Sequence, residues 1–321
     1  MMNSLGDALG SVLAVILMIA LGFGLSKRGW FKGEAGSLIS RLVVSVALPA
    51  YMLANLMGGY DRAKLLSMLP GLPIPFAVML ICFVLAFGMA ALFRITPSRR
   101  GTFASMFGLS NTIFIGLPVN IALFGEGSLP YVLLSYIANT TLFWTIGVYG
   151  IARDGALLNG RQKPSLFSLD GLKRILSPPL VSFLVAVALI LVGVSLPAPL
   201  MTLCKTLGAM TTPLSMLFIG IVISRVEWRK LRLEKDVLLV VAGRFLVSPL
   251  VLVLLARNAD LPPLMKSVFF VQAAMPAMTQ TPILANAYGA DSEYAGIATS
   301  LTTVLSLASI PLCMLAVGKL F

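Results

Sequence analysis

Two apolar stretches of the chain each carry amide and hydroxyl side chains close to proline or glycine. These residues are Asn111, Thr112, Gly116, Pro118, Pro276, Thr279, Gln280 and Pro282. Amide and hydroxyl groups can hydrogen bond to a ligand, but they carry no charge at neutral pH. Their type and spacing therefore point to the binding of a small molecule rather than to acid–base or metal chemistry.

The prolines predict that both stretches are broken helices. Proline removes a backbone donor and clashes with the preceding turn, so a helix that contains Pro276 and Pro282 must release amide and carbonyl groups. Hydrocarbon cannot satisfy such groups, and they must face protein or a wet cavity. If Pro118 and Pro282 lie in the first turns of two half-helices, both positive helix ends point at the centre and favour an anion.

An alternative reading treats the two breaks as simple proline kinks. The Asn and Gln side chains near the breaks would then hydrogen bond to neighbouring helices, and each bond would stabilise the helix packing by about 1 kcal/mol. A binding site is favoured because the breaks recur at equivalent places in the sequence. Pro118 and Pro282 differ by 164 positions, and so do the pairs Pro49 and Pro213 and Gly125 and Gly289.

The composition is that of a membrane protein. Of the 321 residues, 58% are hydrophobic and 11% are charged, and the mean hydropathy is +0.97, which excludes a soluble enzyme. The chain has no histidine and only three dispersed cysteines, so the usual zinc motifs and the Ser/His/Asp triad are missing. We therefore expect no metal and no cofactor.

Ten apolar runs are long enough to cross a bilayer, which takes about 20 helical residues. They are residues 8–26, 42–60, 65–93, 101–125, 127–152, 175–204, 206–224, 237–256, 267–290 and 294–318. Residue 111 lies about 15 Å inside its run, near the bilayer midplane. The predicted fold is an all-α polytopic membrane protein with ten transmembrane helices.

The basic residues predict how these helices are oriented. Lys and Arg concentrate in residues 27–41, 94–100, 153–174 and 225–235, which alternating spans place on one side. The rule that cytoplasmic loops are basic puts both termini on the extracytoplasmic side of the cytoplasmic membrane. The net charge of +12 is thus read as a topology signal, and no nucleic-acid partner is expected.

The offset of 164 divides the chain into two repeats. Residues 1–152 form a first five-helix repeat, residues 153–174 a cytoplasmic linker and residues 175–321 a second repeat. Because five is odd, the two repeats have inverted topology. Transporters commonly bind their substrates between such halves.

Three further polar residues lie inside predicted spans. Arg244 could extend to the cytoplasmic interface or could attract a carboxylate into a pathway, and both readings remain open. Asn55 and Asn139 could line the same cavity as the broken helices or bond to a neighbouring helix. All twelve acidic residues are placed in loops or at span edges, which disfavours cation exchange.

Two longer motifs resemble a known family. The stretch Ser110-Asn-Thr-Ile-Phe-Ile-Gly-Leu-Pro118 continues to Phe124-Gly-Glu126, and Ala273-Ala-Met-Pro-Ala277 continues to Tyr288-Gly-Ala-Asp291. Both resemble the signatures of the auxin efflux carrier family. The resemblance implies an inverted repeat in which the broken helices 4 and 9 cross, as in the bile acid:sodium symporters. It also implies a homodimer that moves organic anions such as auxin, malate or malonate.

The expected function is secondary transport of a small mono- or dicarboxylate by alternating access within the lipid bilayer. Sodium held by neutral oxygen atoms, as in the related symporters, a proton, or the membrane potential alone could drive it. An intramembrane enzyme is a remote alternative that would need a Ser or Thr nucleophile activated by Lys205 or Arg244. A receptor or structural membrane protein would need no broken helices.

Overall fold

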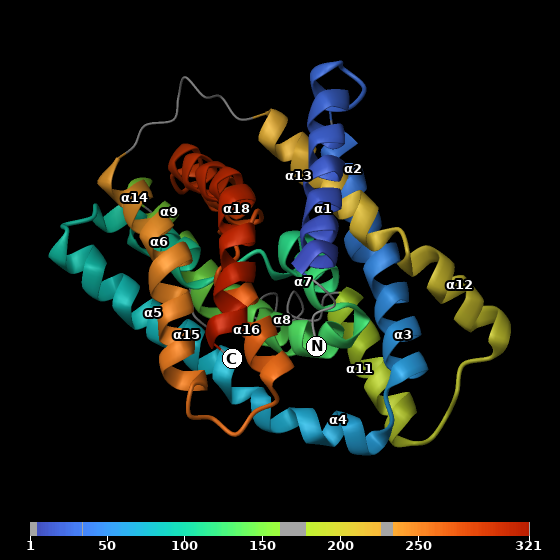
Figure 1. The fold of residues 1–321 in the computed structure, drawn as a ribbon. Coiled ribbons are helices and arrows are strands. Elements are labelled where there is room, and N and C mark those ends of the chain that lie inside the picture. The colour runs from blue at the N-terminus through green and yellow to red at the C-terminus, as the bar shows by residue number, and fades with distance from the viewer. Residues whose placement is uncertain (1–4, 34, 161–177, 226–233, 321) are drawn as a thin grey trace. The chain divides into compact units, whose positions relative to one another are not determined.

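The chain is helical throughout the part that a computed structural model describes, namely residues 5–33, 35–160, 178–225 and 234–320 (Figure 1). Helices satisfy their own backbone hydrogen bonds, which is what an apolar sequence requires inside a bilayer. Turns and loops join the helices, and the one β-type pairing among the described residues is an isolated antiparallel bridge between Ser110 and Ala277.

The chain forms two compact units, and each draws on both halves of the sequence. Unit 1 comprises Met1–Gly71, Ile113–Leu133 and Leu176–Arg225. Unit 2 comprises Leu72–Thr112, Leu134–Ile175 and Val226–Phe321. The predicted repeats 1–152 and 175–321 were defined by matching positions in the sequence, whereas the units are defined by contacts in space. The repeats therefore remain a prediction.

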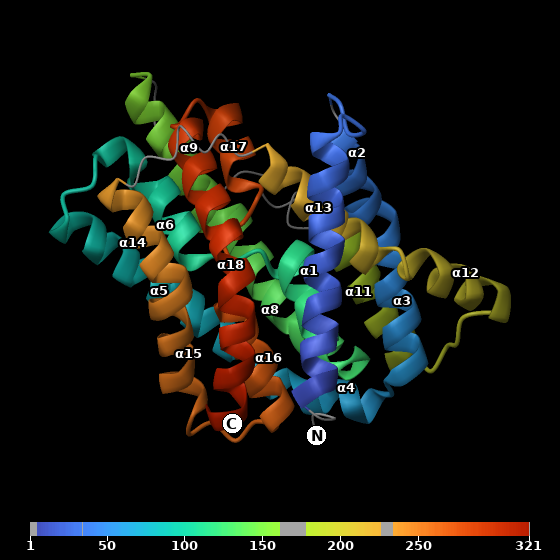
Figure 2. The same cartoon turned by 45° about the horizontal axis from the view of Figure 1, so that its top comes forward.

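Unit 1 contains eight helices and three short helical turns among the described residues. They are α1 (Leu5–Lys27), α2 (Ala35–Leu42), η1 (Val43–Ala47), α3 (Leu48–Gly59), α4 (Arg62–Met68), η2 (Leu69–Gly71), α7 (Leu117–Phe124), η5 (Glu126–Ser128), α11 (Pro178–Leu191), α12 (Ala198–Gly208) and α13 (Thr211–Ser224). Helix α1 lies along α13 (Figures 1 and 2). A Cβ atom on Gly220 would lie 2.2 Å from the Ile19 carbonyl oxygen, so glycine permits this close packing.

Unit 2 contains the remaining helices of the described residues, except for the turn η4 (Thr112–Gly116), which is divided between the two units. They are α5 (Pro73–Leu92), η3 (Pro97–Arg99), α6 (Arg100–Gly108), most of α8 (Leu129–Leu142), η6 (Phe143–Gly147), α9 (Val148–Leu158), α14 (Lys235–Ala242), η8 (Gly243–Val247), α15 (Ser248–Ala256), α16 (Pro263–Ala273), α17 (Thr281–Tyr288) and α18 (Ser292–Leu320). Helix α6 packs against α5 and α9, and α18 packs against α14, α16 and α17. The short helix α6 is buried along its length, except at Arg100, and this central position matters for the site.

Six helical stretches of the described residues are long and apolar enough to cross a membrane. They are Ala35–Gly59, Arg62–Leu92, Glu126–Leu158, Ala198–Ser224, Lys235–Ala256 and Ser292–Gly318. The other predicted spans contain shorter apolar helices, such as Leu13–Lys27 and Pro178–Leu191, or interrupted ones. The structure is thus that of a polytopic membrane protein, while the count of ten spans stays a prediction.

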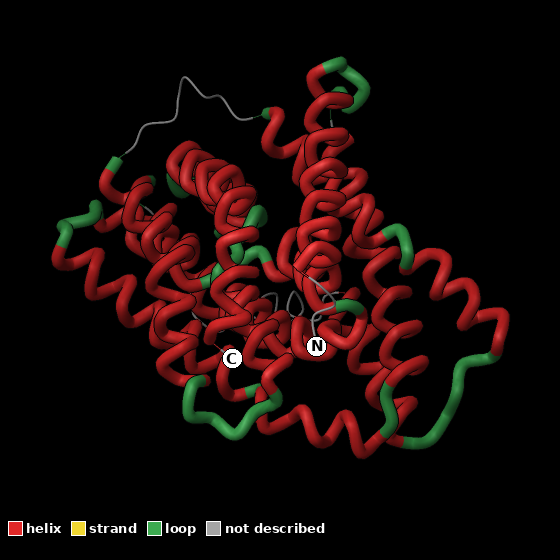
Figure 3. Tube along the Cα trace, viewed as in Figure 1, coloured by secondary structure: helices red, strands yellow, loops and turns green. Residues whose placement is uncertain are grey.

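Two predicted boundaries differ from the structure. The run 175–204 contains two helices, α11 and α12, which a loop joins (Figure 3). Gly193, with a φ of 74°, follows the end of α11, and Pro197 precedes α12. The run 127–152 continues as helix to Leu158, so the first residues of the predicted linker 153–174 are helical. From position 161 onward that linker lies outside the described residues.

The helices that follow the two breaks match at the sequence offset of 164. Helices α7 and α17 each have eight residues, with a proline as the second residue. Gly125 and Gly289 follow them with φ angles of 73° and 71°, a region that favours glycine. The ψ angles of the two glycines differ, at −174° and 25°, so the match is limited to helix length, proline position and φ, and the repeat remains a prediction.

Candidate functional site

The first interruption follows α6, which ends at Gly108. Leu109 is extended, with φ −111° and ψ 141°, and helical structure resumes with a π-helical turn at Thr112–Gly116. No proline lies between Gly108 and Thr112. Pro118 instead lies inside the helix that follows, so proline alone does not account for this break.

The second interruption contains its own proline. Helix α16 ends at Ala273, and α17 begins at Thr281 with Pro282 as its second residue. Proline at the first helical turn has no amide to leave unsatisfied, and its fixed φ suits a helix start. Pro276 lies within the break itself, where it prevents α16 from continuing.

The two broken segments pair with each other inside unit 2. The Asn111 amide donates to the Pro276 carbonyl oxygen at 2.8 Å, next to the bridge between Ser110 and Ala277. The Ala277 amide donates to the Thr302 hydroxyl oxygen at 3.2 Å. Each break therefore satisfies backbone groups of the other, which is what a dry environment demands.

Two amide side chains hold the first break in place. Asn139, which is fully buried on α8, accepts a hydrogen bond from the Ser110 amide at 3.0 Å. Gln272 on α16 donates from Nε2 to the Thr112 carbonyl oxygen at 3.3 Å. Asn139 was predicted from the sequence as a site residue and Gln272 was not, although an amide side chain inside an apolar run was a usable signal.

The start of α17 leaves polar atoms without partners. Oε1 of Gln280 and Oγ1 of Thr281 are buried and have no hydrogen-bond partner among the described residues. Thr279 and Gln280 are half-buried, whereas Thr281 is fully buried. Buried polar atoms normally have partners, so unsatisfied atoms beside a helix N-terminus are where a ligand would be held.

Arg244 joins the ends of both helices that lead into the breaks. It lies in the π-helical turn η8 and is 1% exposed. Its guanidinium donates to the carbonyl oxygens of Phe107, Ala273 and Met275 at 3.1, 2.7 and 2.9 Å. One of the two sequence-based predictions was that the Arg244 side chain extends to the cytoplasmic interface. That prediction is wrong, because the side chain is buried.

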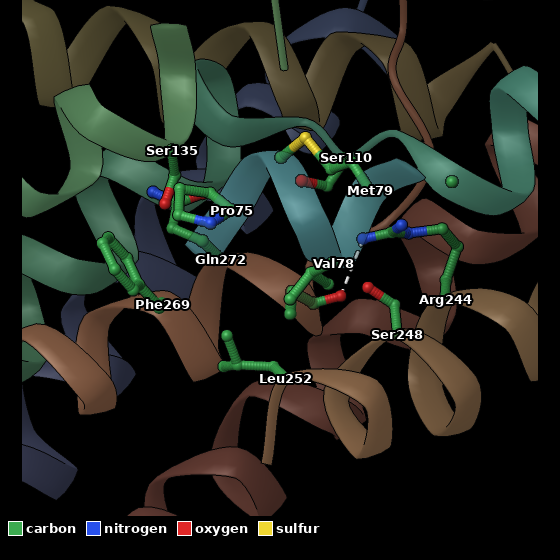
Figure 4. Close-up of a pocket in the computed structure, with 12 residues that line it drawn as sticks. Pro75, Val78, Met79, Ser110, Ser135, Arg244, Ser248, Leu252, Phe269 and Gln272 are labelled. Carbon is green, nitrogen blue, oxygen red and sulfur yellow. Dashed lines mark hydrogen bonds between the residues drawn. The ribbon is translucent and has the colours of Figure 1, made fainter. Parts of the chain in front are cut away.

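A small cavity of about 20 Å³ lies beside the Arg244 guanidinium (Figure 4). Its polar lining consists of Ser110, Ser135, Arg244, Ser248 and Gln272. Oε1 of Gln272 is buried without a partner among the described residues. A cavity of this size has room for about one water molecule, so it is too small for a carboxylate substrate.

The acidic residues are less peripheral than the sequence indicated. Asp154 lies on α9 and is fully buried, and it accepts hydrogen bonds from the Gly101 and Thr102 amides at 3.1 and 2.7 Å. Asp236 is 4% exposed at the start of α14. Asp154 thus caps the helix whose other end meets Arg244, a role that no local sequence signal predicted.

Three sequence-predicted site residues belong to unit 1. Pro118 is buried in α7, and the Gly116 carbonyl oxygen accepts a bond from the Asn120 side chain at 2.7 Å. Asn55 on α3 donates to the Tyr51 carbonyl oxygen at 3.3 Å. The other candidates lie in unit 2, where the contacts described above gather Asn111, Thr112, Asn139, Pro276 and Arg244 around the paired breaks.

The apolar helices and paired interruptions define a multi-pass helical membrane protein. Comparison with known proteins then identifies its family: residues 7–314 match the membrane transport protein family, and the chain belongs to it. This confirms the resemblance to the auxin efflux carriers. Membership of a transporter family also agrees with the expectation of a transporter rather than an enzyme.

Three relatives are similar over nearly their whole length. The chain is 24% identical to an "Uncharacterized transporter" of Methanocaldococcus jannaschii, over 94% of this chain and 96% of that protein. It is 27% identical to an "Uncharacterized transporter" of Methanothermobacter thermautotrophicus, with coverage of 94% and 96%. It is 22% identical to a "Putative malonate transporter" of Rhizobium meliloti, with coverage of 95% and 94%.

Proposed function

We propose that this membrane transporter moves a small organic anion, a mono- or dicarboxylate, by alternating access. The substrate binds at the paired breaks, through the side chains of Asn111, Thr279 and Gln280 and through backbone amides of the breaks. Thr112, Asn139, Pro276 and Pro282 shape this site within unit 2. The helices that contain the breaks are the fourth and ninth of ten, and they cross.

One observation carries the proposal: two interrupted helices pair through the Asn111 amide and the Pro276 carbonyl oxygen. Such irregular backbone at membrane depth is tolerated where it is buried in protein or lines a cavity, and transporters use it to bind substrates. Buried atoms without partners at Gln280 and Thr281 add hydrogen-bonding capacity at the same break. Alternating access also needs separate bodies, and the chain folds into two compact units.

The charge balance at the breaks favours an anion. Residues 101–125 and 261–290 contain no acidic side chain. The buried guanidinium of Arg244 and the positive N-terminus of α17 both attract a carboxylate. Malonate is the first dicarboxylate to test, because one relative, at 22% identity, carries that substrate in its name.

Flux into proteoliposomes tests the proposal. Protein reconstituted in liposomes should move labelled malonate, malate or another carboxylate of a small panel, and unlabelled substrate should compete. Asn111→Ala should abolish flux without loss of folded protein, since the backbone bond from the Asn111 amide remains. Asn258→Ala, the same substitution at an exposed loop position, is the matched control and should transport normally.

Two outcomes would contradict this assignment. If no carboxylate moves while the protein remains folded, the substrate class is wrong. If Asn111→Ala transports as well as the wild type, Asn111 is not in the site. A thermal-shift panel with the same anions is independent of flux, because a ligand that binds the folded state raises its apparent stability.

Orientation and assembly follow as further parts of the proposal. Both termini lie outside the cytoplasm, in the cytoplasmic membrane, because basic loops stay inside. A tag at either terminus should therefore react with an impermeant reagent in intact cells, and protection of both tags would reverse the topology. The family resemblance implies a homodimer, which light scattering in detergent can measure.

A further inference from the structure

The proposed function uses the positive charge of Arg244 but not the carbonyl oxygen atoms that surround its guanidinium. Its side chain is the largest among those that are fully buried in the described residues. A Cβ atom on the neighbouring Gly243 would lie 2.3 Å from the Phe107 ring, so the backbone of η8 packs directly on α6. This close approach brings the guanidinium to the last turn of α6.

The three acceptors of Arg244 are all carbonyl oxygens at helix ends. Phe107 is the penultimate residue of α6, Ala273 is the last residue of α16, and Met275 lies two residues beyond it. The last carbonyl groups of a helix have no partner within the helix and carry partial negative charge. Arg244 therefore sits in a cage of oxygen atoms that two negative helix ends create.

No carboxylate balances this guanidinium among the contacts of the described residues. The ion pairs found there are made by Arg99, with Glu234, Asp236 and Asp291. Neutral carbonyl oxygens at the ends of interrupted helices are also the ligands that membrane proteins use for monovalent metal ions. The carbonyl oxygen atoms around Arg244 are thus of the ligand type that alkali cations take.

We infer that Arg244 is a built-in cation that occupies a carbonyl cage otherwise suited to a monovalent ion. The guanidinium neutralises both helix ends permanently, so the folded protein needs no sodium there. The cavity beside it, with Ser248 and Gln272 in its lining, offers further oxygen ligands once the side chain is removed (Figure 4). Removal of the side chain therefore creates a site for a small cation.

Thermal unfolding of the purified protein in detergent tests this inference. The wild type should have the same midpoint in sodium and in N-methylglucamine chloride at equal ionic strength. Arg244→Ala should melt lower by about 5 °C or more in N-methylglucamine. Guanidinium chloride, far below denaturing concentrations, should restore part of the loss in a dose-dependent way, since an ion that binds the folded state stabilises it. Sodium should do so more weakly.

Arg225→Ala is the matched control. Arg225 follows the end of α13, is exposed and donates to the Gly33 carbonyl oxygen at 3.0 Å. This variant should melt near the wild-type temperature and show no response to guanidinium. If Arg244→Ala gains no more stability from guanidinium or sodium than this control, Arg244 acts through its shape and the inference fails.

A second variant, Arg244→Lys, and a second measurement, the carboxylate flux described below, cover the case in which Arg244→Ala does not fold. Arg244→Lys keeps the charge, so it should fold. Its melting temperature should lie between those of the wild type and Arg244→Ala and should not rise in sodium. A gain from sodium in Arg244→Lys or in the wild type would overturn the inference. These melting experiments stand whether or not a carboxylate is transported.

The consequence for coupling rests on the proposed function. With the cage filled by Arg244, carboxylate flux by the wild type should be equal in sodium and in N-methylglucamine. Sodium-dependent flux would contradict the inference but would leave the substrate class intact. Absence of all carboxylate flux would contradict the proposed function alone.

Discussion

The two ends of α6 carry buried side chains of opposite charge. At its start the carboxylate of Asp154 accepts the amides of Gly101 and Thr102, and at its end the guanidinium of Arg244 donates to the Phe107 carbonyl oxygen. Both arrangements match the dipole of the helix. The first amides and last carbonyl groups of a helix have no partner within it, and buried side chains complete these hydrogen bonds at both ends of α6.

The two ends differ in what they connect. Among the described residues, the hydrogen bonds of Asp154 run from α9 to α6 alone, so this carboxylate anchors one half-helix. Arg244 contacts α6, α16 and the break that follows α16. Loss of Asp154 should therefore loosen one helix, whereas loss of Arg244 should disturb both breaks together.

The largest effect is expected from Arg244→Met, which keeps much of the volume but removes the charge and all five donors. Three buried carbonyl oxygens lose their partner, and the free energy of unfolding should fall by about 3–5 kcal/mol. Denaturant unfolding in detergent measures it, with Arg225→Met as the control. A loss of under about 1 kcal/mol would show that the two helix ends do not depend on this cation.

Gly243→Ala tests whether the close approach of η8 to α6 positions the guanidinium. The added methyl group would collide with the Phe107 ring, which cannot move freely in a packed interior, so stability should fall by about 1–3 kcal/mol. Gly24→Ala is the control, because no neighbouring heavy atom lies within 4 Å of its Cβ position and alanine favours a helix. Equal behaviour of the two variants would contradict the packing described.

Asp154→Ala examines the opposite end of α6. Two amide groups lose a charged acceptor, and the free energy of unfolding should fall by about 1–2 kcal/mol, less than for Arg244→Met. Asp154→Asn retains one acceptor oxygen and should lose about half as much. If Asp154→Ala proved more damaging than Arg244→Met, the proposed difference between the two ends would be reversed.

Arg99→Ala should have the smallest effect, because this cation is at the edge of unit 2. Its side chain is 26% exposed and pairs with Glu234 at 2.7 Å and Asp291 at 2.8 Å. Burial alone would lower the pKa of Arg99, but hydrogen bonds and charge interactions with these two carboxylates raise it overall.

The contribution of Arg99 should be about 1 kcal/mol or less and should shrink as salt screens the pairs. Melting temperatures of Arg99→Ala and the wild type should therefore converge at high ionic strength. The deficit of Arg244→Met should persist there, because its partners are buried dipoles. If the loss in melting temperature of Arg99→Ala did not depend on salt, Arg99 would stabilise the fold through buried dipoles, as Arg244 does, and not through exposed ion pairs.

The sequence predicted the second break well and the first one less directly. Pro276 and Pro282 stop α16 and start α17 through effects that act within one helical turn. The first break has no proline between Gly108 and Thr112, and its extended backbone is held by Asn139 and by Pro276. Such support comes from other helices, which a local pattern does not reveal.

Composition, the spacing of apolar runs and the positions of proline and glycine were enough to indicate a helical membrane protein with two interrupted helices. These are local properties, since each depends on a residue and its near neighbours in the chain. The partners of Arg244 and Asp154 were decided by packing: Phe107 lies 137 positions from Arg244, and Gly101 lies 53 from Asp154. Whether a buried charge meets a carbonyl, an amide or a carboxylate depends on which helices lie side by side, and only the folded chain brings those helices together.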